Sequence, residues 1–129
     1  MYLLDTHILL WAVSEQHKLS TRVRDIIAND DNVIYVSIAS FWELQIKKAT
    51  NKVTFPDNLH EISSAVGYTK MPITEHHILA LSQLPLIHRD PFDRMLLAQS
   101  LHEGCTLITN DQEILQYNAA LIDNSMNSH

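Results

Sequence analysis

The stretch from His88 to Asp111, HRDPFDRMLLAQSLHEGCTLITND, constrains the fold more than any other part of the sequence. It predicts a loop, a helix and a strand that ends on an acid. Asp90 and Pro91 are typical of the cap and first position of a helix, and Gly104 is a typical helix stop. The helix body is apolar on nearly every side, so we expect it to be buried. The acids at the edges of this stretch therefore adjoin residues that belong in a core.

Short apolar strands alternate with helical segments along the whole chain. We expect strands near residues 2–4, 33–36, 68–71 and 105–109, and a last apolar segment at 119–122. This alternation favours an α/β fold with a mostly parallel central sheet and helices on both faces. No repeat, low-complexity segment or linker interrupts the pattern. Residues 1–129 are therefore predicted to form a single domain, with residues 123–129 as a frayed tail.

The charge balance limits the ways in which the chain could bind a polyanion. Nine basic residues against fifteen acidic ones give a formal net charge of −6. A nucleic acid would therefore need a local basic patch or a metal ion. Neither GxGxxG nor GxxxxGK[ST] occurs, which excludes the usual glycine-rich phosphate loops. No apolar run approaches the ~20 residues of a membrane span, and the N-terminus lacks a signal-peptide pattern. With Cys105 as the one cysteine, we expect a cytoplasmic protein with no membrane partner.

Four acidic residues stand where the predicted elements meet. Asp5 follows the first strand, and Glu43 comes early in the helix after the strand at 33–36. Asp93 falls in the first turn of the buried helix, and Asp111 follows the strand at 105–109. In open α/β sheets, ligands bind beyond the carboxyl ends of the strands. We therefore expect these four acids, from four separate segments, to converge on one edge of the sheet.

Each acid also has a purely structural explanation when it is considered alone. Asp5 and Asp111 suit helix N-caps, and the segment from Ser40 to Glu43 fits a capping box. Asp90 and Asp93 suit a helix N-terminus through the helix dipole. The large apolar residues that directly precede three of the acids argue against capping as the whole explanation: Leu4, Trp42 and Phe92. Carboxylates crowded in a partly buried pocket repel one another, and Mg²⁺ or Mn²⁺ would remove that cost.

Three segments, in this order, resemble the PIN-domain ribonucleases, and specifically the VapC-type toxins of toxin–antitoxin pairs: LLDTHILLWA, SIASFWELQIKKA and HRDPFDRMLLAQSLHEGCTLITND. The resemblance covers nearly the whole chain. It implies a PIN-like three-layer sandwich and an endoribonuclease that hydrolyses RNA phosphodiester bonds with Mg²⁺ or Mn²⁺. The residues that it assigns to catalysis and metal binding are Asp5, Glu43, Asp93 and Asp111, with Asp90 and Thr6 as additional candidates for the metal.

The resemblance also implies partners: an RNA substrate, a cognate antitoxin and a second copy of the chain in a homodimer. The candidates for contact with the RNA backbone are the basic residues near the motifs: Lys47, Lys48, Lys52, Arg89 and Arg94. For the two adjacent lysines, a solvated helix end is the alternative. An apolar surface is predicted to serve the dimer or the antitoxin, formed by Leu9, Trp11, Ile38 and Trp42.

Two other functions are compatible with parts of the pattern. A phosphatase of the haloacid dehalogenase type also has an aspartate after its first strand, but it requires a second acid two residues later, where this chain has His7. A non-catalytic PIN-like binding module would be expected to have lost one or more of the acids, and all four are present. Both alternatives are therefore weaker than the nuclease.

Overall fold

The computed structural model describes residues 1–87, 89–117 and 119–125. Its centre is one sheet of five parallel strands in the order β3-β2-β1-β4-β5. The strands are β1 (Tyr2–Leu4), β2 (Ile34–Ser37), β3 (Thr69–Met71), β4 (Thr106–Thr109) and β5 (Leu121–Asp123). In the central register, Leu3 of β1 lies between Tyr35 and Leu107. The predicted parallel sheet is confirmed.

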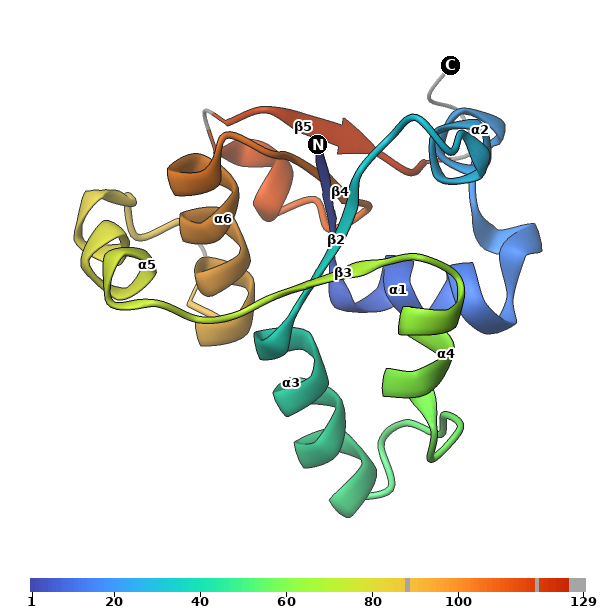
Figure 1. The fold of residues 1–129 in the computed structure, drawn as a ribbon. Helices are drawn as coiled ribbons and strands as arrows, with labels where there is room; N and C mark the ends of the chain where they lie inside the picture. The colour runs from blue at the N-terminus through green and yellow to red at the C-terminus, as the bar shows by residue number, and fades with distance from the viewer. Residues whose placement is uncertain (88, 118, 126–129) are drawn as a thin grey trace.

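Helices cover both faces of this sheet (Figure 1). They are α1 (Thr6–Ser14), α2 (Thr21–Ala28), α3 (Ile38–Ala49), α4 (Leu59–Ala65), α5 (Glu75–Ala80) and α6 (Pro91–Glu103), with 3-10 turns η1 (Gln16–Lys18), η2 (Leu81–Gln83) and η3 (Ile114–Gln116). Among the described residues, none of these helices has the length and apolar character that a membrane span requires.

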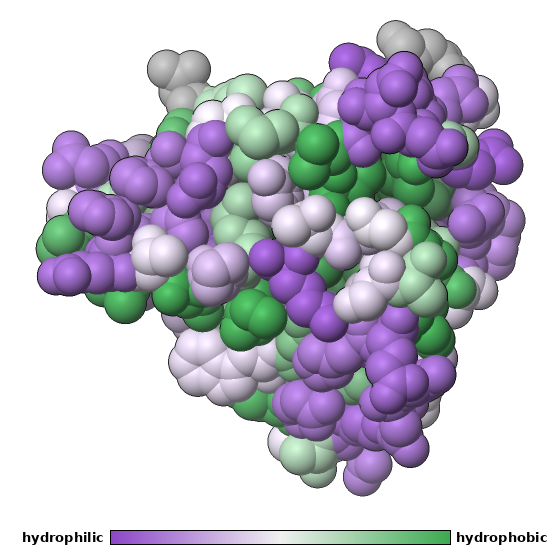
Figure 2. Space-filling view, in the orientation of Figure 1, coloured by the Kyte–Doolittle hydropathy of each residue, from purple (hydrophilic) through white to green (hydrophobic). Residues whose placement is uncertain are grey.

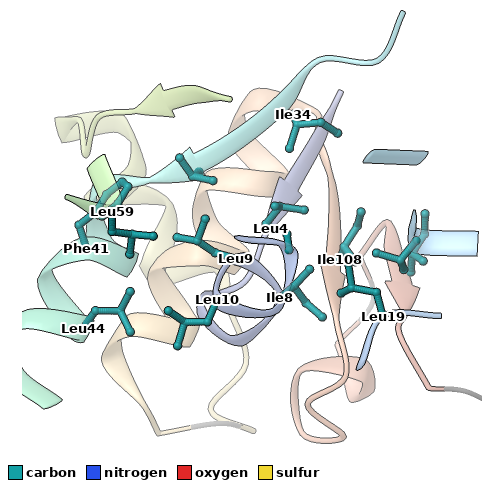
Figure 3. Close-up of a cluster of buried hydrophobic side chains, with 14 residues drawn as sticks. Leu4, Ile8, Leu9, Leu10, Leu19, Ile34, Phe41, Leu44, Leu59 and Ile108 are labelled. Atoms are coloured by element: carbon teal, nitrogen blue, oxygen red, sulfur yellow. The ribbon is translucent and has the colours of Figure 1, made fainter. Parts of the chain in front are cut away.

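Neighbouring residues of β1 point into two separate cores, because side chains alternate along a strand. Leu4 packs with apolar residues of α1 to α4 in the cluster that Figure 3 shows. Leu3 packs on the opposite face, with Leu96 and Leu97 of α6 and with Leu107 of β4. The middle of the helix at 91–103, residues 96–100, is buried as predicted, but its last turn is exposed, including Leu101 at 48%. Two cores on the two faces of one sheet make the three-layer sandwich.

The chain order of the strands reverses beside β1. From β1 the chain moves outward to β2 and β3, and then it crosses to β4 and β5 on the other side. Beyond the carboxyl ends of β1 and β4, the flanking connections diverge and leave room for a ligand. The two strand ends are joined there by the N–H of Asp5, which donates to the carbonyl oxygen of Ile108 at 3.0 Å.

Several helix starts and stops follow local sequence signals. Asp90 caps α6, and Gly104 ends it with a left-handed backbone at φ 68°. The capping box predicted for the segment from Ser40 to Glu43 is wrong. The Ser37 hydroxyl caps α3 by accepting from the N–H of Ala39 at 3.0 Å, which puts that segment inside the helix. Glu43 is therefore available for contacts other than capping.

The C-terminal segment is more ordered than a frayed tail from residue 123 would be. Asp123 belongs to β5, and Asn124 is buried. The Asn124 side chain accepts from the N–H of Ser20 at 2.8 Å and donates to the carbonyl oxygen of Lys18 at 3.1 Å. Its own N–H donates to the carbonyl oxygen of Thr109 at 2.7 Å. The prediction fails here because a contact 104 residues away is invisible to local pattern; residues 126–129 lie outside the described part.

Replacing Asn124 by Ala is expected to lower the free energy of unfolding by about 2 kcal/mol, because the buried N–H of Ser20 loses its acceptor. Denaturant unfolding monitored by circular dichroism measures this loss. Asn58→Ala is the matched control, since Asn58 is exposed and its side chain makes no capping hydrogen bond to α4. Equal losses in the two variants would contradict a structural role for Asn124.

Candidate functional site

A cleft of about 200 Å³ opens beyond the carboxyl ends of β1 and β4. The residues that line it are Asp5, Thr6, His7, Glu43, Lys47, Asp90, Asp93 and Asp111. The four acids that the sequence placed at one edge of the sheet thus do lie together, with the two additional candidates beside them. A larger hollow of about 430 Å³ between η1 and α2 has no comparable group of acids, so the smaller cleft is the candidate site.

Asp5 is the most buried of the four aspartates in the cleft, and both of its oxygens are held. One accepts from the N–H of Ile8 at 2.9 Å, and the other accepts from the hydroxyl of Thr109. Burial raises the pKa of the Asp5 carboxyl, and the negative charge of Asp111 adds to the rise. The two hydrogen bonds and the nearby His7 lower this pKa but do not cancel the rise. The folded protein therefore keeps a carboxylate where its charge is costly.

Glu43 connects α3 to α1. The Thr6 hydroxyl donates to one Glu43 oxygen at 2.7 Å, and Thr6 Oγ1 also lies 3.0 Å from Ser40 Oγ. The other Glu43 oxygen accepts from the ammonium of Lys47 at 2.6 Å. Glu43 is buried although it belongs to the second turn of a helix, because it points to the cleft and away from solvent.

The N-terminus of α6 brings two aspartates to the cleft. The Asp90 side chain accepts from the N–H of Phe92 at 2.9 Å and from the N–H of Asp93 at 3.0 Å. Capping thus explains Asp90, yet its carboxyl also borders the cleft. Partial burial by itself lowers the pKa of Lys47, but the bond to Glu43 and the charges of Glu43, Asp90 and Asp93 outweigh it and raise that pKa. Lys47 therefore faces the acids of α6 as well as its own helix neighbour.

Asp111 closes the cleft from the end of β4. One of its oxygens accepts from the N–H groups of Glu113 and Ile114, at 2.8 and 3.2 Å. Its own N–H donates to Thr109 Oγ1 at 3.0 Å. The same hydroxyl donates to Asp5, so Thr109 joins the two aspartates across the ends of β1 and β4.

The donor set suits a hard divalent cation, because carboxylate oxygens are the ligands that Mg²⁺ and Mn²⁺ prefer. Within residues 1–87, 89–117 and 119–125, no three acidic, histidine or cysteine side chains already form a ligand set around one point. Mg²⁺ does not need such a set in place beforehand, because it keeps several of its water molecules and binds only one or two carboxylates directly.

Comparison with known proteins identifies the family. The sequence matches the PIN domain over residues 2–120. The chain belongs to the PIN-domain family. A similar fold occurs in VapBC2 from Rickettsia felis bound to a DNA fragment from its promoter, with a TM-score of 0.70 and 17% sequence identity over 95% of this chain and 97% of that chain. FitAcB from Neisseria gonorrhoeae is also similar, with a TM-score of 0.67 and 16% identity over 96% of this chain and 98% of that chain. A toxin–antitoxin complex from Klebsiella pneumoniae has a TM-score of 0.68 and 14% identity over 96% of this chain and 98% of that chain. No curated protein matches the sequence significantly.

Family membership confirms the predicted PIN-like sandwich and sets aside the haloacid dehalogenase alternative. One residue of the cleft in this PIN domain is missing from the sequence prediction. His7 lines the cleft, and its charge lowers the pKa of Asp5. Its place directly after Asp5 and Thr6, at the start of α1, is the signal that could have indicated it.

The predicted RNA-binding residues of the PIN domain fall into different environments. Lys48 pairs with Asp57 and lies over the ring of Phe55, outside the cleft. Arg94 donates to the carbonyl oxygens of Pro85 and Leu81 and so supports a loop. Four of the five line hollows beside the cleft and near α6: Lys47 and Lys52 in one, Arg89 and Arg94 in the other. Among the described residues, Lys52 has no ion pair, which leaves its charge for a ligand.

The prediction of an exposed apolar surface is wrong for Leu9 and only partly right for Trp11. Leu9 is fully buried in the core of Figure 3, and Trp11 is half-buried against that core. Ile38 and Trp42 do reach the surface of α3, where Trp42 is 59% exposed and meets the ring of Phe92 edge-on at 5.0 Å. In Figure 2, hydrophobic side chains reach the surface near the start of α3, whereas hydrophilic ones cover α2.

Proposed function

We propose that this PIN domain is a metal-dependent endoribonuclease that hydrolyses RNA phosphodiester bonds and acts as the toxin of a toxin–antitoxin pair. The observation that carries the proposal is the convergence of Asp5, Glu43, Asp93 and Asp111 on one cleft at the point where the strand order reverses. Family membership and the likeness to a toxin–antitoxin complex support the same conclusion. Four converging acids are more than a non-catalytic binding module requires.

Asp5 and Asp93 are the main candidates for holding Mg²⁺ or Mn²⁺, with Glu43 and Asp111 as further ligands or as residues that orient the attacking water. Asp90 and Thr6 lie close enough to the same cleft to contribute. A bound divalent ion supplies charge stabilisation at phosphorus and a water of lowered pKa. The chain supplies rigid placement, because Ile8 and Thr109 fix the Asp5 carboxyl.

The test is direct. Purified protein with Mg²⁺ or Mn²⁺ is expected to cut single-stranded RNA internally, and EDTA is expected to stop the reaction. Addition of excess Mg²⁺ should restore it. A protein that binds RNA and shows no metal-dependent cleavage would instead support the non-catalytic binding module.

The RNA strand is proposed to leave the cleft along a neighbouring hollow of about 190 Å³, which shares three residues with the cleft: Glu43, Lys47 and Asp90. The rest of its lining offers an aromatic ring, an apolar side chain, a hydroxyl and a cation, from Phe92, Ile46, Thr50 and Lys52. A stacked base and its phosphate need these groups.

Lys52→Met is expected to weaken RNA binding about threefold to tenfold and to reduce the slope of log affinity against log salt by about one. Binding of a labelled RNA at several salt concentrations, with EDTA present to prevent cleavage, measures both. Lys48→Met is the matched control, because Lys48 is already paired with Asp57 away from the hollow. If Lys52→Met and Lys48→Met bind the RNA with the same affinity, the proposed path of the RNA is wrong.

The exposed apolar side chains of α3 are proposed to contact a second copy of the chain or the antitoxin. They are Ile38, Trp42 and Ile46. Light scattering of the purified chain tests the homodimer, and a monomer at high concentration would contradict it. Co-expression with the product of the neighbouring reading frame tests the antitoxin.

A further inference from the structure

Both oxygens of Glu43 are already engaged by the chain itself. The Thr6 hydroxyl donates to one oxygen, and the Lys47 ammonium binds the other. The Glu43 side chain is only 6% exposed, so water cannot easily replace either partner. To ligate a metal ion, Glu43 would have to give up one of these contacts. Asp93 and Asp111 line the same cleft.

Lys47 is not an ordinary solvated lysine at a helix end. Its ammonium lies in the cleft, where the charges of Asp90 and Asp93 from α6 act on it together with Glu43. Lys48, the next residue, provides the contrast. It turns away from the cleft and pairs with Asp57, whose side chain is 93% exposed. Of two adjacent lysines on α3, one is therefore directed into the acidic cleft and the other out of it.

The role of Lys47 follows from the balance of acidic and basic side chains that line the cleft. Asp5, Glu43, Asp90, Asp93 and Asp111 contribute five carboxyl groups, and Lys47 is the lysine that stands among them. A divalent ion at the Glu43 side would meet the ammonium at close range, and like charges repel strongly in a partly buried site. An ion at the aspartates keeps the Glu43–Lys47 pair intact.

We propose that Lys47 is a resident cation of the cleft. It neutralises Glu43, makes Glu43 a positioning residue for Thr6, and restricts the cleft to one divalent ion held by the aspartates. This inference rests on the proposed function, since it concerns the metal of the same site. It assigns the Glu43 carboxylate to the ion pair and leaves it out of the metal's ligands.

Titration of the metal-free protein with Mn²⁺ in a calorimeter tests this without any measurement of activity. The wild type is expected to bind one ion per chain. Lys47→Met is expected to bind Mn²⁺ at least about tenfold more tightly, or to bind a second ion, because the repelling charge is gone. Lys47→Gln serves as a second variant in case the apolar side chain disturbs folding. Lys48→Met is the matched control and is expected to stay within about twofold of the wild type.

The double variant Glu43→Gln with Lys47→Met is the decisive one, because it removes the pair and leaves the net charge unchanged. If the pair is a neutral unit, this variant keeps one Mn²⁺ with an affinity within about threefold of the wild type. A loss of about a hundredfold would identify Glu43 as a ligand and overturn the inference. So would a Lys47→Met protein that binds Mn²⁺ as the wild type does.

Asp93→Asn separates this inference from the proposed function. If the wild type binds Mn²⁺ and Asp93→Asn loses it, the metal site stands, and the Lys47 variants then decide the inference alone. If the wild type binds no Mn²⁺ and no Mg²⁺, the metal-dependent nuclease is itself wrong and the inference falls with it.

Discussion

Replacing Asp5 by Asn is expected to lower the rate of metal-dependent RNA cleavage by about a thousandfold and, at the same time, to raise the melting temperature of the metal-free protein. Activity falls because an amide cannot supply the charge that holds the metal. Stability rises because burial has raised the pKa of this carboxyl above its ordinary value, so the charged form is unfavourable in the folded state. The amide oxygen still accepts from the N–H of Ile8, and the amide can still meet the Thr109 hydroxyl.

The direction of the pH effect follows from the same shift. For an acid whose folded pKa is raised, the folded state binds more protons than the unfolded state between the two pKa values. The penalty from Asp5 is therefore absent below its unfolded pKa, grows as the pH rises from the unfolded to the folded pKa, and is complete above the folded one. We expect Asp5→Asn to gain most over the metal-free wild type above that window. Melting curves at several pH values in EDTA measure this gain.

Two controls make the prediction specific. Asp57→Asn removes an acid that is exposed and lies outside the cleft, so it should change neither activity nor the response to metal. Asp93→Asn is expected to lose activity to a similar extent as Asp5→Asn. Mg²⁺ should raise the melting temperature of the wild type and have little effect on either cleft variant. An Asp5→Asn protein that still cleaves RNA at the wild-type rate would exclude the proposed site.

Local patterns in the sequence were sufficient to predict the elements that carry the site. Short apolar runs marked the strands, and the cap at Asp90 and the left-handed Gly104 fixed the ends of α6. Because parallel strands share one edge for their carboxyl ends, the convergence of Asp5 and Asp111 followed from their positions after β1 and β4. The structure places both beside one cleft.

Contacts between distant segments were beyond the reach of those patterns. The faces of α1 could not be distinguished from its sequence, because Leu9 and Trp11 are both apolar; packing buries the first completely and the second only in part. Likewise, a capping box is a rule about residues close in the sequence. It could not anticipate that Glu43 accepts a hydrogen bond from Thr6, 37 residues away in the chain. Asn124 shows the same limit at the other end of the sequence.

Thr109→Val is expected to lower the cleavage rate by about a hundredfold although Thr109 lies behind the acids and holds no metal in the proposed site. Valine keeps the shape of the side chain and removes the hydroxyl. The Asp5 oxygen then loses its donor, and the N–H of Asp111 loses its acceptor. Each aspartate thus loses one of the contacts that fix its position at the ends of β1 and β4, although backbone N–H groups still bind one oxygen of each. Thr109→Ser keeps the hydroxyl and should retain activity within about tenfold of the wild type.

The pH profile distinguishes this positioning role from a general loss of packing. The Thr109 hydroxyl lowers the pKa of Asp5 against the larger effect of burial. Without the hydroxyl that pKa rises further, so protons compete with the metal up to a higher pH. The acid limb of the rate profile should therefore move to higher pH in Thr109→Val and stay in place in Thr109→Ser. A slower Thr109→Val protein with an unshifted acid limb would mean that the hydroxyl serves the fold of β4 and does not act through Asp5.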